Sequence, residues 1–103
     1  MTEKQKEQRR IAYARSYGVC EVCGKPLVMG AMQAAHRIGN TKTWRAKYGS
    51  FIIDHPLNVG YVDSLECNAK LDISYKPNEV LKLLSDIVVY EINRFQGGEY
   101  DNE

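Results

Sequence analysis

Residues 63–72 hold the densest group of chemically useful side chains in this chain. If the stretch is helical, Asp63 and Cys67 share one face because they are four residues apart. Asn68 and Asp72 are also four apart and share the neighbouring face. A short helix of this kind could hold two metal ions, one that closes the fold and one that does chemistry. A solvated polar helix with one buried cysteine is the plainer alternative.

A second candidate for metal binding is the pair Cys20 and Cys23, which Gly24 and Pro26 follow. This is the spacing of a zinc knuckle, in which a tight turn aims both sulfurs at one ion. A redox pair has the same spacing, but no βαβ pattern surrounds this one. The three cysteines of the chain cannot all pair with one another, so metal binding is the better use of the pair.

The length of 103 residues predicts a single domain, 1–103, with a modest core that a metal ion would help to stabilise. No run of residues is apolar for long enough to span a bilayer, so we expect no membrane partner. The N-terminus begins charged and lacks the apolar stretch of a signal peptide, which favours a cytoplasmic protein.

The net charge of +1 conceals an uneven distribution. Residues 1–50 carry ten Lys or Arg and three Glu, a balance of +7, whereas residues 51–103 carry four Lys or Arg and ten Asp or Glu, a balance of −6. A basic half can neutralise phosphates and so favours nucleic acid. The alternative is that the two halves attract each other within one domain or across a dimer.

Helical periodicity predicts a first helix over residues 3–17, which Gly18 ends, with its basic residues in solvent. Its expected apolar stripe consists of Ile11, Ala12, Ala14 and Tyr17. A last helix is predicted over residues 79–95, capped by Asn78 and ended by Gly97 and Gly98, with a frayed acidic tail over residues 99–103. We expect this last helix to pack in the core or to form a homodimer.

Between these helices we predict two short strands, residues 27–29 and 32–38, which form a hairpin around Gly30. His36 would then lie near the end of the second strand. A short basic helix is expected over residues 42–48, with Thr41 or Asn40 as its cap.

The order of these features, a cysteine pair, a hairpin that ends in His, a loop with Asn, and a helix with Cys, Asn and Asp, resembles the HNH nuclease family. The resemblance covers residues 20–73 and implies an α+β fold with a ββα-metal core and a zinc knuckle, between an N-terminal helix and a long C-terminal helix. It rests on Cys20, Cys23, His36, Asn58, Cys67 and Asn68.

The resemblance also implies roles for particular residues. His36 matches the general base that activates water for attack on a phosphodiester. Asn58 matches an Asn that braces the loop and holds the His ring. Asn68 and Asp72 match positions that hold a catalytic metal, and their hard oxygen ligands suit Mg²⁺ or Mn²⁺. The implied ligands of a structural zinc are Cys20, Cys23, Asp63 and Cys67.

Two positions depart from the family pattern. Ala35 stands before the proposed base, where an Asp or His often binds the metal. Asp63 replaces a cysteine in the second half of the zinc site, which should weaken that site. Asp54 and His55 also resemble a metal and base pair, but they lie too close to Asn58 in the sequence, so we rank them below His36.

Four basic residues flank the proposed base, and Trp44 and Tyr48 are interleaved with them. They form a reasonable surface for the phosphates of DNA, without a helix suited to base-specific recognition. The four residues are Arg37, Lys42, Arg45 and Lys47.

The sequence thus predicts a small zinc-stabilised HNH endonuclease that cuts DNA, of the kind often found in phages or mobile elements. The first alternative is a catalytically inactive HNH-like module that binds nucleic acid or a protein partner. The second is a plain zinc-knuckle interaction domain that dimerises through its last helix.

Overall fold

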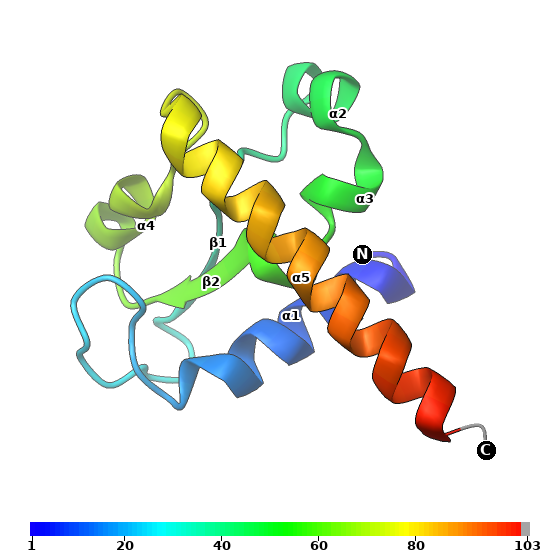
Figure 1. The fold of residues 1–103 in the computed structure, drawn as a ribbon. Coiled ribbons are helices and arrows are strands. Elements are labelled where there is room, and N and C mark those ends of the chain that lie inside the picture. Colours follow the sequence, from blue (N-terminus) through cyan, green and yellow to red (C-terminus); the bar gives the residue numbers. More distant parts are fainter. Residues whose placement is uncertain (102–103) are drawn as a thin grey trace.

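Two short antiparallel strands lie at the centre of the fold, as the computed structural model, which describes residues 1–101, shows (Figure 1). The elements follow one another as α1 (Glu3–Ser16), β1 (Gln33–His36), α2 (Lys42–Tyr48), α3 (Ser50–Ile53), the 3-10 turn η1 (Pro56–Asn58), β2 (Val59–Val62), α4 (Leu65–Leu71) and α5 (Pro77–Asp101). The predicted α+β class, with an N-terminal helix and a long C-terminal helix, is therefore confirmed.

The register of the two strands decides which side chains share a face of the sheet. Ala35 pairs with Gly60, and Val62 lies on the same face, where it packs with Ala35 against α4. Because successive side chains of a strand point to opposite faces, His36 and its partner Val59 lie on the other face of the sheet. The ring of Tyr61 on this second face meets Tyr13 of α1, with centroids 5.5 Å apart. Each face of the sheet is thus covered by one helix.

The predicted hairpin around Gly30 is wrong in its strand pairing. Residues 27–29 form no strand, and β1 pairs instead with β2, which follows it after α2, α3 and η1. The physical reason is burial, because Val28 and Met29 are 62% and 78% exposed, whereas Val59 and Val62 are buried. A strand pair persists where it hides an apolar face.

Helix α1 begins at a capping box and is held to the body by polar as well as apolar contacts. The Thr2 hydroxyl accepts a hydrogen bond from the Gln5 amide at 3.1 Å, and the Gln5 side chain accepts one from the Thr2 amide. Gln8 is buried and donates to the carbonyl oxygens of Ile53 and His55 at 3.0 and 2.9 Å.

The predicted apolar stripe of α1 is correct for Ala12 alone. Ile11 is only half-buried, Ala14 is exposed and Tyr17 is 91% exposed. The buried face consists of Gln8, Ala12 and Ser16. A buried Gln can replace an apolar residue here because its side-chain amide donates to two backbone carbonyls, which leaves no buried donor of that amide unpaired.

Most of the buried apolar side chains form two separate groups. One lies between the sheet and α4 and consists of Cys20, Ala35, Val62, Cys67 and Leu71. The other lies under α5 and consists of Ile38, Ile53, Val80, Leu83 and Ile87, with Trp44 and Tyr48 of α2 at its edge. Thr41 caps α2, as predicted, since its hydroxyl accepts from the Trp44 amide at 3.2 Å.

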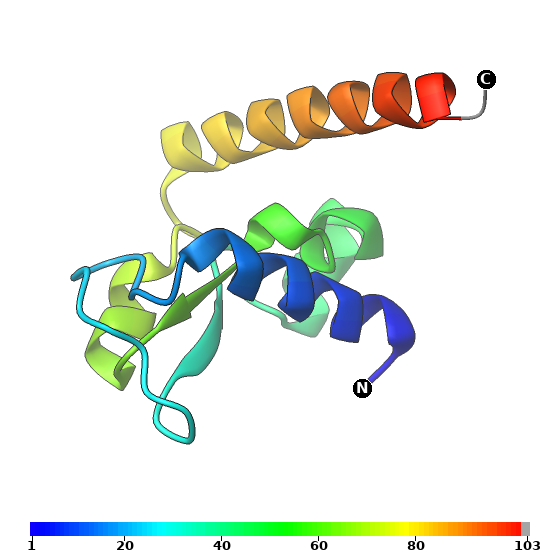
Figure 2. The same cartoon turned by 90° about the horizontal axis from the view of Figure 1, so that it is seen from below.

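Helix α5 is longer than predicted. It begins at Pro77, so that Asn78 lies within it, and it continues through the two glycines to Asp101. Part of the predicted acidic tail is therefore helical, and residues 102–103 lie outside the described residues. Figure 2 shows α5 as a separate layer that runs across the other elements. None of the helices within residues 1–101 is long and apolar enough to cross a membrane.

Over residues 77–96, where the structure describes the side chains, only one side of α5 is covered by the rest of the chain. Leu81, Val88, Ile92 and Phe95 are between 52% and 73% exposed, and they follow one another at intervals of seven, four and three residues. This spacing places them along one stripe of the helix and is typical of a seam between two helices.

A homodimer through this stripe remains a prediction. We expect the protein to elute with the mass of a dimer in size-exclusion chromatography with light scattering, and Ile92→Glu to convert it to a monomer because the new charge would be buried in the seam. Asn93→Glu, which adds the same charge one position off the stripe, should leave the mass unchanged. A wild-type protein that stays monomeric at high concentration would contradict the dimer.

Candidate metal centre

Four potential metal ligands converge where the knuckle meets the start of α4. They are Cys20, Cys23, Asp63 and Cys67, whose ligand atoms all lie within 4.8 Å of one another. A tetrahedral zinc site with Zn–S bonds of about 2.3 Å has ligands about 3.8 Å apart. The four side chains therefore need to draw in by only about 1 Å to surround one zinc ion. The structure brings together the ligand set that the sequence predicts for a structural zinc.

The knuckle itself has the geometry of a thiolate site. The Gly24 amide bonds to the Cys20 carbonyl at 3.0 Å, which closes a tight turn, and Gly24 has the positive φ of +78° that such a turn needs. The Val22 amide donates to the Cys20 sulfur at 3.4 Å. Backbone N–H groups that point at a sulfur favour its thiolate form, the form that binds metal.

Asp63 and Cys67 reach the cluster from the end of β2 and the first turn of α4. The helix is shorter than the sequence predicts, because it begins at Leu65 with Ser64 as its N-cap. Asp63 therefore precedes the helix, and its carboxylate accepts a bond from the Cys23 thiol at 3.4 Å. Its other oxygen is buried and has no hydrogen-bond partner. A buried carboxylate oxygen without a donor is costly, and a metal ion would satisfy it.

The protonation of the cluster also favours a cation. Burial opposes the Cys20 thiolate, but the amides of Cys23, Val22 and Asp63 outweigh it and lower the pKa of Cys20. The Ser64 hydroxyl lowers the pKa of Cys67, but burial and then Asp63 outweigh it and raise that pKa to about 11. Without a metal, Cys67 thus keeps its proton beside the carboxylate and lowers the pKa of Asp63. A dication would replace that proton.

The proposed base, His36, lies on the other face of the sheet. Its partner across the ladder is Val59, and its ring is half-buried. The charged groups that act on it are Arg9, Asp54 and Arg45. Burial and then the positive charge of Arg9 lower the pKa of His36, while Asp54 opposes them. The imidazole is therefore neutral at pH 7, the form that a general base requires.

Asn58 is a brace for the loops around His36. Its side chain is completely buried, accepts a bond from the Ile38 amide at 2.8 Å, and donates to the carbonyl oxygens of Ile38 and Ile53 at 3.1 and 3.0 Å. The structure gives no hydrogen bond between Asn58 and His36 among the described residues. Leaving these buried groups unpaired would cost about 1–3 kcal/mol each, so Asn58 fixes the backbone on both sides of η1.

Asn68 and Asp72 lie on the α4 side of the sheet, and the structure does not bring them next to His36. The Asn68 amide donates to the Gln33 side chain at 3.2 Å. Asp72 is exposed at the end of α4 and accepts a bond from the Ser74 amide at 2.8 Å. Ala35 occupies the strand position that faces α4, buried against Cys67 and Leu71. Both predicted ligands of the catalytic metal thus have local partners.

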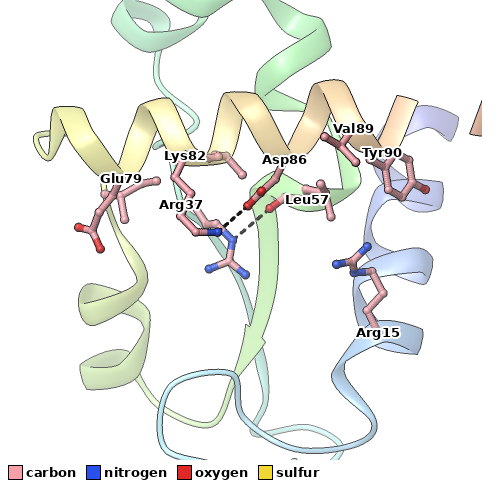
Figure 3. A pocket seen from close by; sticks show the side chains of 10 residues that line it. Arg15, Arg37, Leu57, Glu79, Lys82, Asp86, Val89 and Tyr90 are labelled. Carbon is pink, nitrogen blue, oxygen red and sulfur yellow. Dashed lines mark hydrogen bonds and ion pairs between the residues drawn. The ribbon is translucent and has the colours of Figure 1, made fainter. Parts of the chain in front are cut away.

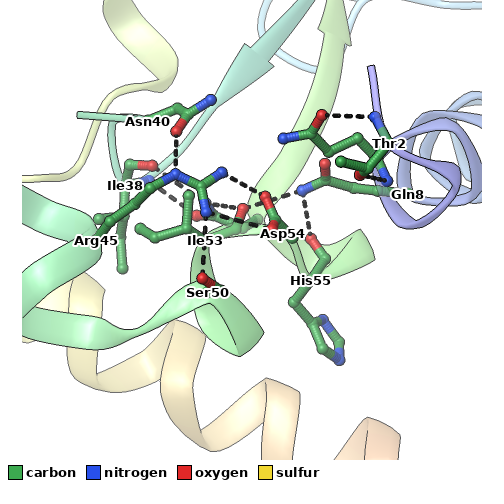
Figure 4. A network of polar contacts seen from close by, with 11 residues as sticks. Thr2, Gln8, Ile38, Asn40, Arg45, Ser50, Ile53, Asp54 and His55 are labelled. Atoms are coloured by element: carbon green, nitrogen blue, oxygen red, sulfur yellow. Dashed lines mark hydrogen bonds and ion pairs between the residues drawn. The ribbon is translucent and has the colours of Figure 1, made fainter. Parts of the chain in front are cut away.

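Two of the four basic residues predicted to bind DNA are held in ion pairs. Arg45 bonds to Asp54 at 2.6 and 3.2 Å and to Asn40 at 2.6 Å, a network that Figure 4 shows beside Gln8. Arg37 bonds to Glu21 at 2.6 Å and to the Leu57 carbonyl at 3.0 Å.

Arg37 also forms part of a groove of about 540 Å³ along α5 (Figure 3). Arg15 and Lys82 add positive charge to this groove, but Glu79 and Asp86 add as much negative charge. The groove is therefore of mixed charge.

The remaining two basic residues are more accessible. Lys42 is exposed, and Lys47 lies over the rings of Trp44 and Tyr48, with its nitrogen 5.6 and 5.4 Å from their centroids. Cationic and aromatic side chains on one helix are suited to contact with a nucleic acid backbone.

His55 serves the fold. It is buried, its Nδ1 atom accepts from the Leu57 amide at 3.1 Å, and its Nε2 atom lies 3.1 Å from the Glu91 carboxylate of α5. Figure 4 shows its ring pointing away from the pair of Arg45 and Asp54. Both ring nitrogens are thus engaged, which agrees with the lower rank that the sequence gives His55 as a base.

Comparison of the chain with protein-family models, with curated proteins and with solved structures finds no match.

The metal centre predicts coupled binding and folding. Protein purified without added metal should contain about one zinc per chain, and EDTA should lower its melting temperature. Asp63→Asn should weaken zinc binding in a competition with a chromophoric chelator, whereas Asp72→Asn, which removes a carboxylate outside the cluster, should not. If the purified protein contains no metal and its melting temperature is the same in EDTA, zinc does not stabilise the fold.

Proposed function

We propose that this protein is a zinc-stabilised endonuclease of the HNH type, which hydrolyses phosphodiester bonds of DNA with a divalent metal. The observation that carries the proposal is His36, a half-buried and neutral imidazole at the end of a strand whose far side packs on the proposed zinc centre. The order of the cysteine pair, this histidine, Asn58 and Asn68 along the chain supports the same function.

In this proposal each residue has a defined task. His36 takes a proton from water as the water attacks the phosphorus. Asn58 fixes the loops that flank the base. Asn68 and Asp72 would hold Mg²⁺ or Mn²⁺, which supplies charge stabilisation to the phosphate and the leaving oxygen. Lys42 and Lys47 of α2 supply contacts to the DNA backbone.

A catalytically inactive module that binds nucleic acid or a protein partner is the second candidate, and a specific observation favours it. Ala35 stands on the α4 face of β1 without a ligand atom, while His36 lies on the opposite face from Asn68 and Asp72. Cleavage thus requires the metal and the base to meet at the end of the strand when substrate binds. A module that only binds has no such requirement.

A plasmid-nicking assay separates the two candidates. We expect nicking with Mg²⁺ or Mn²⁺ and none in EDTA. The rate should rise with pH and be half-maximal below the ordinary His pKa of about 6.5, because burial and Arg9 lower the pKa of His36 and only the deprotonated ring is a base. His36→Ala should reduce the rate by about 10²–10⁴-fold while DNA binding persists. If the protein binds DNA but does not nick it with any divalent metal, the nuclease is rejected and the binding module is favoured.

Ala35→Asp tests the arrangement on the α4 side with a readout apart from activity. The new carboxylate would be buried near Cys67 and Leu71, at a cost of several kcal/mol unless a cation neutralises it. We therefore expect Mn²⁺ to raise the melting temperature of Ala35→Asp more than that of the wild type, and nicking to increase with it. Ala35→Asn serves as the uncharged control. Equal metal responses in all three proteins would contradict a metal site between β1 and α4.

A further inference from the structure

Arg9 of α1 lies beside His36, although the sequence gives no reason to connect them. Tyr13 of α1 meets Tyr61, which pairs with Ala34 across the ladder. Arg9 is one helical turn before Tyr13, and His36 is the next residue of β1 on the same face as Ala34. One turn along the helix and two residues along the strand thus place Arg9 and His36 at facing positions of α1 and the sheet. Arg9 is accordingly among the charges that depress the pKa of His36.

The bonding of Arg9 is unusual for an arginine at a helix–sheet contact. Its Nε atom is buried and has no hydrogen-bond partner, and among the side chains of residues 1–96, which the structure describes, it forms no ion pair. The His36 ring also forms no hydrogen bond within that range. The adjacent residue Arg10, in contrast, is exposed and pairs with Glu7 at 3.5 Å. A buried donor without an acceptor is rare in folded proteins and indicates that an acceptor is missing.

The charges around the two residues select the kind of acceptor. Arg9 and Arg45 carry positive charge, and Asp54 is the one acidic group among those that act on His36. Asp54 is already bonded twice by Arg45, so its charge is largely satisfied. With His36 neutral, the group keeps an excess positive charge and a free Nε–H donor. An anion with several acceptor oxygens meets both needs, and arginine is well suited to phosphate.

We propose that Arg9 and His36 form a binding site for a phosphate oxyanion, between α1 and the end of β1. Resting on the proposed function, this site holds the phosphodiester next to the base, with Arg9 as its positioning residue. Arg45 contributes charge from its fixed pair with Asp54 and does not move to the ligand. The DNA backbone then crosses the α1 face of the sheet, and the exposed lysines of α2 extend the surface.

The first test uses inorganic phosphate at constant ionic strength and follows the His36 ring and the Arg9 Nε–H by NMR. Both signals should shift in the wild type and reach saturation. Arg9→Gln should abolish the shift of His36 and raise its pKa in the phosphate-free protein. Arg10→Gln removes the same charge from the next residue and should change neither. A His36 shift that does not saturate, or that persists in Arg9→Gln, overturns the site.

The second test uses a short DNA duplex in place of inorganic phosphate. Arg9→Gln should lower the salt slope of log K by roughly 0.9, because the variant neutralises one phosphate fewer, and should reduce nicking by about 10²-fold. Arg9→Lys keeps the charge without the Nε donor and should retain part of the affinity. An unchanged amide spectrum away from α1 shows that the variants remain folded.

The outcomes separate the site from the proposed function. Nicking by Arg9→Gln at the rate of Arg10→Gln overturns the oxyanion site and leaves the nuclease in place. Saturable phosphate binding that depends on Arg9, in a protein that neither binds nor cuts DNA, establishes the site and rejects the nuclease in favour of a free phosphate compound as ligand.

Discussion

A sheet of two strands has two faces and too few residues to bury either one alone, and the whole fold follows from how these faces are covered. One face packs on α4 and on the two buried cysteines, Cys20 and Cys67. The other packs on α1. The small group of buried side chains on the α4 side is where a zinc ion would contribute most, because two of its members are also metal ligands. The second group of buried apolar side chains lies under α5.

The same division of faces separates the candidate chemistry. Adjacent strand positions point in opposite directions, so Ala35 faces the zinc side and His36 faces α1. The resemblance to the HNH family implies that His36 and Asn68 belong to one site. The strand register, however, places them on opposite faces of the sheet. His36 acquires Arg9, Asp54 and Arg45 as its neighbours. The ionisation of His36 is therefore influenced by charged groups of α1 and of the segment that contains α2 and α3, and not by the helix that carries the proposed metal ligands.

The sequence predicted correctly those structural features that depend only on residues close together in the chain. We predicted correctly that Cys20 and Cys23 lie together, that Thr41 is a helix cap and that a short basic helix follows it. Each of these features is decided within a few residues. The strand pairing was wrong because the partner of β1 lies beyond two helices, and residues 27–29 look as apolar in sequence as Val59 and Val62 do. The buried role of Gln8 was likewise invisible, since the carbonyls that it satisfies belong to residues 53 and 55.

Charge counts illustrate the same limit. The basic first half of the chain suggests many phosphate ligands, yet Arg37 and Arg45 direct their charge to Glu21 and Asp54. The Glu21 carboxylate lies where a side chain on residue 60 would have to be, so Gly60 makes room for it beside Arg37. Arg9, which nothing in the sequence distinguishes from Arg10, is the arginine with a buried donor and no acceptor among the described residues. The charge count of a segment therefore overstates the cations available to an anion, because the fold pairs some of them with carboxylates and leaves others, such as Arg9, with a donor that has no acceptor among the described residues.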